Sequence, residues 1–172
     1  MYGADILFGP EQMIRRFVKD SSFDQLICVA IAKHSDFKLE GIEDKRTLLH
    51  ARLIRDADKL DNCRVKLEES METLLDMDEK TVGASPISPK VWESCKAEES
   101  VLSADRKTGM DYWMSYLALY FDINFLETYQ IIKEQDYIRR IAERVPYSRE
   151  DTKEKVAYTC LLYTSPSPRD MR

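Results

Sequence analysis

The stretch LLHARLIRDADKLDNCRVKLEE, from Leu48 to Glu69, predicts a single long helix. Neither glycine nor proline interrupts it, and its apolar residues recur at the spacing of a helix that has one apolar stripe. The residues of that stripe are Leu49, Leu53, Ala57, Leu60 and Leu67. This helix is the element around which we expect the rest of the chain to be organised.

A dense charge cluster, residues 55–61, occupies the middle of the predicted helix. Asp58 and Asp61 are three residues apart and share a face, and Ile54 and Val65 flank them on it. Burying a carboxylate without a cation is very costly, so an apolar setting requires a cation nearby. The candidates are a metal ion and three side chains, Arg55, Lys59 and Arg64. The alternative is a solvated helix face that carries exposed ion pairs, the usual arrangement for such a pattern.

The run Asp56-Ala57-Asp58-Lys59-Leu60-Asp61 resembles the last motif of the HD-domain phosphohydrolase superfamily. In that family an aspartate near the end of the domain completes a metal site, and the other ligands are an upstream histidine and a His-Asp doublet. By position in the motif, the resemblance implies that Asp58 is a metal ligand and that Lys59 contacts phosphate. Residues 30–37, 111–113 and 121–125 also resemble one branch of uncharacterised bacterial HD proteins. The similarity extends from about Tyr2 to about Thr159.

The resemblance implies a metal-dependent phosphohydrolase that acts on a nucleotide or another phosphate ester. A divalent metal (Mn, Fe, Mg, Ni or Co) would activate water and polarise the phosphoryl group. Asp61 and Arg64 would order the rim of the substrate site. His34 is a candidate acid, base or added metal ligand, because some members place an extra histidine in this region. The alternative for His34 is a structural cap at the end of a helix.

The chain departs from the family pattern, because it has two histidines and no His-Asp dipeptide. We therefore expect it to lack activity by itself. Residues 1–8 begin directly in a helix-like pattern that resembles the helix after the family's His-Asp doublet, so we interpret the chain as the C-terminal part of a longer protein. The competing hypothesis is a non-catalytic helical regulatory or interaction module that kept the fold and lost the metal site.

Composition narrows the possible partners. The formal net charge is −5 and no basic patch is visible, which argues against binding a nucleic acid polymer. No pair of the four cysteines is spaced as Cys-x-x-Cys, which disfavours zinc ribbons and thioredoxin-like sites. No signal peptide or membrane-length apolar run is apparent, so we expect no membrane association and a reducing, cytoplasmic location.

The predicted fold class is all-α, an HD-like helical bundle that lacks its N-terminal part. We expect residues 1–160 to form one partial domain of about seven or eight helices, packed around the helices at 26–31 and 48–69. Residues 78–89 are predicted to be a loop and residues 124–145 one helix. The aromatic stretch 110–123 is predicted to be core, with Tyr112 or Tyr116 as a possible substrate wall.

The end of the chain, residues 161–172, changes abruptly to a Ser/Pro pattern. It resembles the translation of a sequencing adapter, and the alternative is a genuine disordered tail. Both interpretations predict that this segment has no packed structure.

Overall fold

The computed structural model describes residues 2–164, and within this range it contains helices and no strand, which confirms the all-α class. The chain divides into two compact units, Met1–Asp58 and Lys59–Arg172. The boundary between them falls inside the long helix α3 (Lys45–Glu68), which begins three residues before and ends one residue before the helix predicted at Leu48–Glu69.

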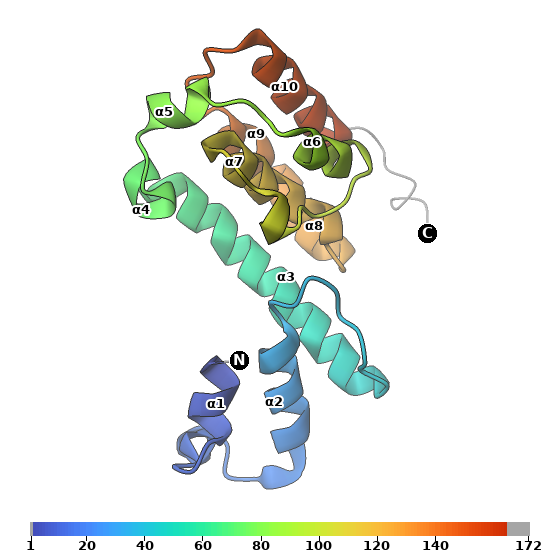
Figure 1. The fold of residues 1–172 in the computed structure, drawn as a ribbon. Coiled ribbons are helices and arrows are strands. Elements are labelled where there is room, and N and C mark those ends of the chain that lie inside the picture. Colours follow the sequence, from blue (N-terminus) through green and yellow to red (C-terminus); the bar gives the residue numbers. More distant parts are fainter. Residues whose placement is uncertain (1, 165–172) are drawn as a thin grey trace. The chain divides into compact units, whose positions relative to one another are not determined.

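The first unit is small and built around a helix pair (Figure 1). Its elements are α1 (Tyr2–Phe8), η1 (Met13–Arg16), η2 (Ser21–Phe23), α2 (Asp24–Lys33) and the first part of α3. The sequence predicted the helix at 26–31 as one of the two helices around which the chain packs, but α2 is not a buried helix. Only Ala30 of α2 is buried, because its main packing partner α1 is a seven-residue helix that covers a single face.

The second unit contains the remaining helices (Figure 1). They are α4 (Met71–Leu75), α5 (Glu79–Ala84), α6 (Pro89–Lys96), η3 (Ser103–Asp105), α7 (Gly109–Ala118), η4 (Leu119–Asp122), α8 (Leu126–Glu134), α9 (Tyr137–Ala142) and α10 (Glu150–Thr164).

Two secondary-structure predictions in this unit are wrong. The predicted loop at 78–89 contains α5, which begins because the Asp78 side chain accepts hydrogen bonds from the backbone N–H groups of Lys80 and Thr81. The single helix predicted at 124–145 is two helices, because the backbone of Asp136 turns to the left-handed conformation with φ 51°.

The C-terminal helix α10 extends four residues into the segment predicted as an unstructured tail. Tyr163 within that extension is buried, its ring stacks on Phe121 at 4.6 Å, and its hydroxyl donates to the Leu117 carbonyl at 2.6 Å. The rest of the predicted tail, residues 165–172, lies outside the described residues.

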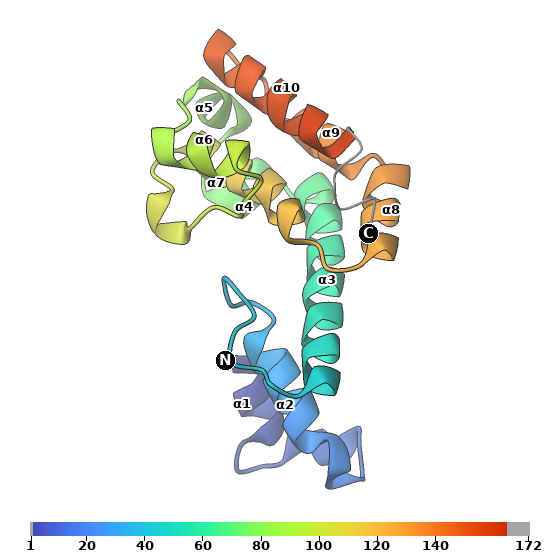
Figure 2. The same ribbon diagram turned by 90° about the vertical axis from the view of Figure 1, so that its right-hand side faces the viewer.

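The core of the second unit is organised around α7. Met110, Trp113, Met114 and Leu117 are fully buried, and α7 packs against α5, α6 and α9. Figures 1 and 2 show α7 among these helices, with α10 lying alongside α9. Each such side chain contributes about 1.5–3 kcal/mol through burial. The aromatic stretch is therefore core, as predicted.

Candidate functional site

The charged segment of α3 contains three buried residues, and they are not the ones that the sequence favoured. Arg55, Asp56 and Lys59 are 7%, 1% and 4% exposed, whereas the side chains of Asp58 and Asp61 are exposed. The sequence pattern did not indicate that Asp56 would be the buried carboxylate. Apolar residues lie at helical spacing from Asp58 as well as from Asp56, so periodicity does not distinguish the two.

In the first unit, Arg55 ties α3 to the end of α2. Its guanidinium donates to the carbonyl of His34 at 2.8 Å, to the carbonyl of Asp36, and to that of Phe37 at 2.9 Å. These carbonyls belong to the C-cap residue of α2 and to the segment after it, where a helix end leaves acceptors without intrahelical partners. Arg55 thus satisfies the negative end of α2 by charge-assisted hydrogen bonds.

His34 lies at this same helix end and is partly buried. Its Nδ1 is 2.6 Å from the Ile31 carbonyl oxygen, an arrangement in which Nδ1 carries the proton and donates it. The Nε2 atom is then the ring position left for a ligand or a proton. The neighbouring Asp36 carboxylate forms an ion pair with Lys33 at 3.0 Å.

In the second unit, the ammonium group of Lys59 is held by Asp122. It donates to the Asp122 backbone carbonyl and forms an ion pair of 3.0 Å with the Asp122 carboxylate. A phosphate group would have to compete with this internal partner for Lys59.

Asp61 and Arg64, the other predicted substrate-site residues, belong to an exposed ladder along α3. Arg64 bonds Asp61 at 3.0 Å and Glu68 at 2.7 Å, and these two carboxylates raise the pKa of its guanidinium. Exposed pairs of this kind contribute little to stability. The ladder agrees with the solvated-face alternative for this part of the helix.

No candidate metal-binding cluster is found among the described residues. Within residues 2–164, no three His, Cys, Asp or Glu side chains gather in a way that could bind one. A divalent cation requires several oxygen or nitrogen ligands, and a single exposed carboxylate such as Asp58 does not meet that requirement.

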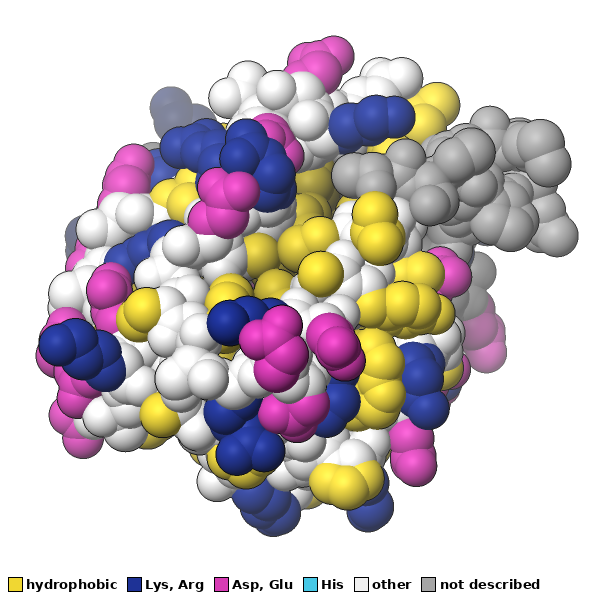
Figure 3. All heavy atoms as spheres, turned by 90° about the horizontal axis from the view of Figure 1, so that it is seen from above, with side chains coloured by type: hydrophobic (Ala, Val, Ile, Leu, Met, Phe, Trp, Pro, Cys, Tyr) yellow, Lys and Arg dark blue, Asp and Glu magenta, His cyan; other side chains and the backbone are white. Residues whose placement is uncertain are grey.

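The second unit carries an apolar groove that the sequence did not indicate. It has a volume of about 550 Å³, and its floor is made by residues of α8, α9 and α10: Ile132, Ile138, Ala142, Val156, Ala157 and Cys160. Figure 3 shows hydrophobic side chains gathered in a hollow, with charged side chains around it, on the side of the molecule where α10 lies.

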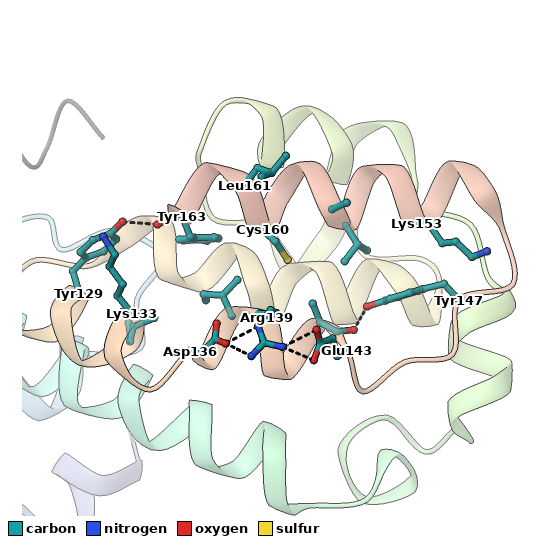
Figure 4. A pocket seen from close by; sticks show the side chains of 15 residues that line it. Tyr129, Lys133, Asp136, Arg139, Glu143, Tyr147, Lys153, Cys160, Leu161 and Tyr163 are labelled. Carbon is teal, nitrogen blue, oxygen red and sulfur yellow. Dashed lines mark hydrogen bonds and ion pairs between the residues drawn. The ribbon is translucent and has the colours of Figure 1, made fainter. Parts of the chain in front are cut away.

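Charged and polar side chains line the rim of this groove (Figure 4). Arg139 bridges Asp136 and Glu143, and Tyr129 donates from its hydroxyl to the Tyr163 carbonyl at 2.6 Å. Burial, followed by the nearby carboxylates of Glu143 and Asp136, raises the pKa of the Cys160 thiol to about 11. Cys160 is therefore a protonated, apolar wall residue and not a nucleophile at neutral pH.

Comparison with family models, with curated proteins and with solved structures finds no match to this chain. Of the helices within residues 2–164, none combines the length and hydrophobicity needed to cross a lipid bilayer.

Proposed function

We propose that this chain is part of a metal-dependent phosphohydrolase of the HD superfamily and that Asp58 is its contribution to the metal site. The proposal rests on the resemblance of residues 56–61 to the last motif of that family. One structural observation supports it: Asp58 remains exposed on α3 although Arg55, Asp56 and Lys59 around it are buried. Buried charges in the middle of a helix cost stability and are often found at functional sites.

The proposal requires donors that the described residues do not supply. They would be the histidine and the His-Asp doublet that the family places upstream of this motif. The divalent metal would supply a water-derived nucleophile and charge neutralisation at the phosphoryl group. The role of this chain would be to fix the orientation of Asp58. Arg55 serves that role in the first unit, because its hydrogen bonds anchor α3 to the end of α2.

The test is the reading frame extended upstream of Met1. An in-frame histidine and His-Asp doublet are expected there, and the extended protein should retain divalent metal in elemental analysis and hydrolyse bis(p-nitrophenyl) phosphate. Asp58→Ala should lose both properties. Glu69→Ala, which removes another exposed carboxylate just after α3, should keep them. Retention of metal by the Asp58→Ala protein would show that Asp58 is not a ligand.

A second candidate function is a non-catalytic helical interaction module, and the groove on α8, α9 and α10 favours it. A groove of about 550 Å³ with an apolar floor is large enough to accept side chains of a partner helix. This hypothesis predicts that the groove binds an apolar fluorescent probe such as 8-anilinonaphthalene-1-sulfonate. Ala157→Lys, at an exposed groove position, should abolish that binding, and Glu154→Lys, elsewhere on α10, should not. Equal binding by both variants would exclude the groove as the binding surface.

A further inference from the structure

A second cavity in the second unit is lined by an arginine, Arg106, that has no carboxylate partner within the described part of the chain. The cavity has a volume of about 640 Å³. It is lined by residues from α4, from the turn after it and from α7, together with Arg106: Glu72, Thr73, Leu74, Leu75, Asp76, Met77, Tyr112 and Tyr116.

Arg106 is held in place from one side. Its guanidinium lies 4.8 Å from the centre of the Tyr112 ring, and its Nη1 is 3.4 Å from the hydroxyl of Ser115. That hydroxyl in turn donates to the Tyr112 carbonyl at 2.7 Å, which leaves its lone pairs for Arg106. Stacking on an aromatic ring compensates part of the cost of removing a guanidinium from water.

The remaining hydrogen-bonding capacity of Arg106 is not satisfied. Its Nε is buried and has no acceptor within residues 2–164, and Arg106 forms no ion pair with a described residue. A buried N–H donor without an acceptor destabilises the folded state, so such a group requires an explanation. Arg106 also lines the cavity, so an anion bound there would supply an acceptor for its guanidinium group.

The aromatic walls suggest what carries that anion. Tyr112 and Tyr116 are one helical turn apart on α7, so they present two rings to the same cavity. Tyr116 is fixed by the Lys66 ammonium group, which lies 4.0 Å from its ring centre, and by its edge-to-face contact with Trp113. Burial raises the pKa of Tyr116, and the positive charge of Arg106 acts in the opposite direction, so the two groups are close enough to interact.

The charge of the lining limits the ligand to a single negative charge. Arg106 is the one cation among the lining residues, and two exposed carboxylates, Glu72 and Asp76, share the cavity. These carboxylates repel polyanions such as nucleoside triphosphates and accept hydrogen bonds from hydroxyl or amino groups. We propose that this cavity binds a small aromatic monocarboxylate, with the carboxylate on Arg106 and the ring against Tyr112 and Tyr116. This proposal is independent of the proposed function, because it involves neither Asp58 nor the groove.

The experiment is a titration of the ¹⁵N-labelled full chain with sodium benzoate. The Arg106 Nε–Hε resonance should shift downfield and saturate, with a dissociation constant on the order of 1 mM. Benzyl alcohol, which has the ring without the charge, and inorganic phosphate, which has the charge without the ring, should each bind at least about 10-fold more weakly.

Three variants separate recognition from folding. Arg106→Gln should lose benzoate binding, and Arg106→Lys should weaken it about 10-fold, because a lysine keeps the charge but not the planar fork. Arg149→Gln, which removes an exposed arginine paired with Asp151, should bind like the wild type. Melting curves establish that each variant is folded. The proposal is overturned if benzoate produces no saturable shift of the Arg106 resonance, or if folded Arg106→Gln binds benzoate as tightly as the wild type.

Discussion

The carboxylate of Asp111 shows how one residue joins separate segments of the second unit. It is fully buried and accepts four hydrogen bonds, from the backbone N–H groups of Ser88, Lys107 and Thr108 and from the Ser88 hydroxyl. It also completes the capping box with Thr108 at the start of α7. The segment that leads into α6 and the segment that leads into α7 are thus joined by hydrogen bonds to the same carboxylate group.

We expect Asp111→Ala to lower the free energy of unfolding by at least about 3 kcal/mol, because it leaves several buried donors without an acceptor. Asp105→Ala is the control, since Asp105 pairs with exposed Lys90 at 3.3 Å and should cost less than about 1 kcal/mol. Both values come from urea unfolding followed by tryptophan fluorescence, because both tryptophans lie in the second unit. If both variants lowered the free energy of unfolding equally, the hydrogen bonds of Asp111 would contribute no more to stability than the ion pair of Asp105 with exposed Lys90.

Two buried cysteines predict how stability depends on alkaline pH. Burial raises the pKa of the Cys63 thiol to about 11 and that of Cys95 to about 12, from an ordinary value of 9.0. The folded state therefore holds these protons more tightly than the unfolded state. Their contribution to stability is complete below pH 9 and is lost as the pH rises toward 11 and 12. Buried Tyr120 and Tyr163, whose pKa values are also raised by burial, act in the same direction.

We therefore expect the urea midpoint of the second unit to fall between pH 9 and pH 11. The part of the absorbance change at 295 nm that comes from buried Tyr120 and Tyr163 should appear together with unfolding and not before it. A urea midpoint that is constant from pH 8 to pH 11 would contradict this expectation.

At the level of single residues, the sequence identified the charged segment but not which of its charged side chains are buried. Periodicity shows that Asp58 and Asp61 share a face of α3, but it does not show which face the rest of the fold covers. That depends on residues distant in sequence, such as Asp122, whose carboxylate and carbonyl hold Lys59. The roles of Asp58, Lys59, Asp61, Arg64 and His34 in phosphohydrolysis remain predictions.

At the scale of elements, Gly83 shows why α5 was missed. The helix is six residues long, too short for a periodic pattern, and is fixed by its Asp78 cap and by a close approach of backbone. A Cβ atom added at Gly83 would lie 2.4 Å from the Pro146 carbonyl oxygen, and the Gly83 carbonyl accepts a hydrogen bond from the Ser148 N–H at 3.1 Å. The long helix α3 was predicted within three residues at its start and one at its end, because its pattern repeats over many turns.

We expect Gly83→Ala to lower the free energy of unfolding by about 2 kcal/mol, because the backbone carbonyl of Pro146 cannot move aside as a flexible side chain would. Ala84→Ser, at the exposed neighbouring position of α5, should have an effect within about 0.5 kcal/mol. Urea unfolding of the two variants measures the difference. If Gly83→Ala were as stable as Ala84→Ser, the close packing of α5 on Pro146 would not hold in solution.

At the scale of the whole molecule, apolar burial is distributed unevenly between the two units. Every buried residue of the main hydrophobic cluster lies at Cys63 or later in the described chain. The buried apolar residues of the first unit are small or few: Ala4, Ile14, Ala30 and Ala51. That unit exposes six large hydrophobic side chains, Ile6, Phe17, Phe23, Phe37, Leu49 and Leu53. The sequence could not show this imbalance, because α2 and α7 are similarly apolar as sequences and differ only in what packs against them.

This imbalance predicts different local stabilities for α2 and α7. A segment opens at a free-energy cost that reflects the apolar surface it buries, and amide hydrogen exchange measures that cost. We expect the amides of α2 to exchange at least about 100-fold faster than those of α7 at neutral pH, because α7 has eight buried residues and α2 has one. Hydrogen–deuterium exchange of the full chain, read by mass spectrometry of peptides from each helix, tests this expectation. Equal protection of the two helices would mean that the exposed apolar residues of the first unit are covered in solution, and cross-linking would then show whether a second copy of the chain covers them.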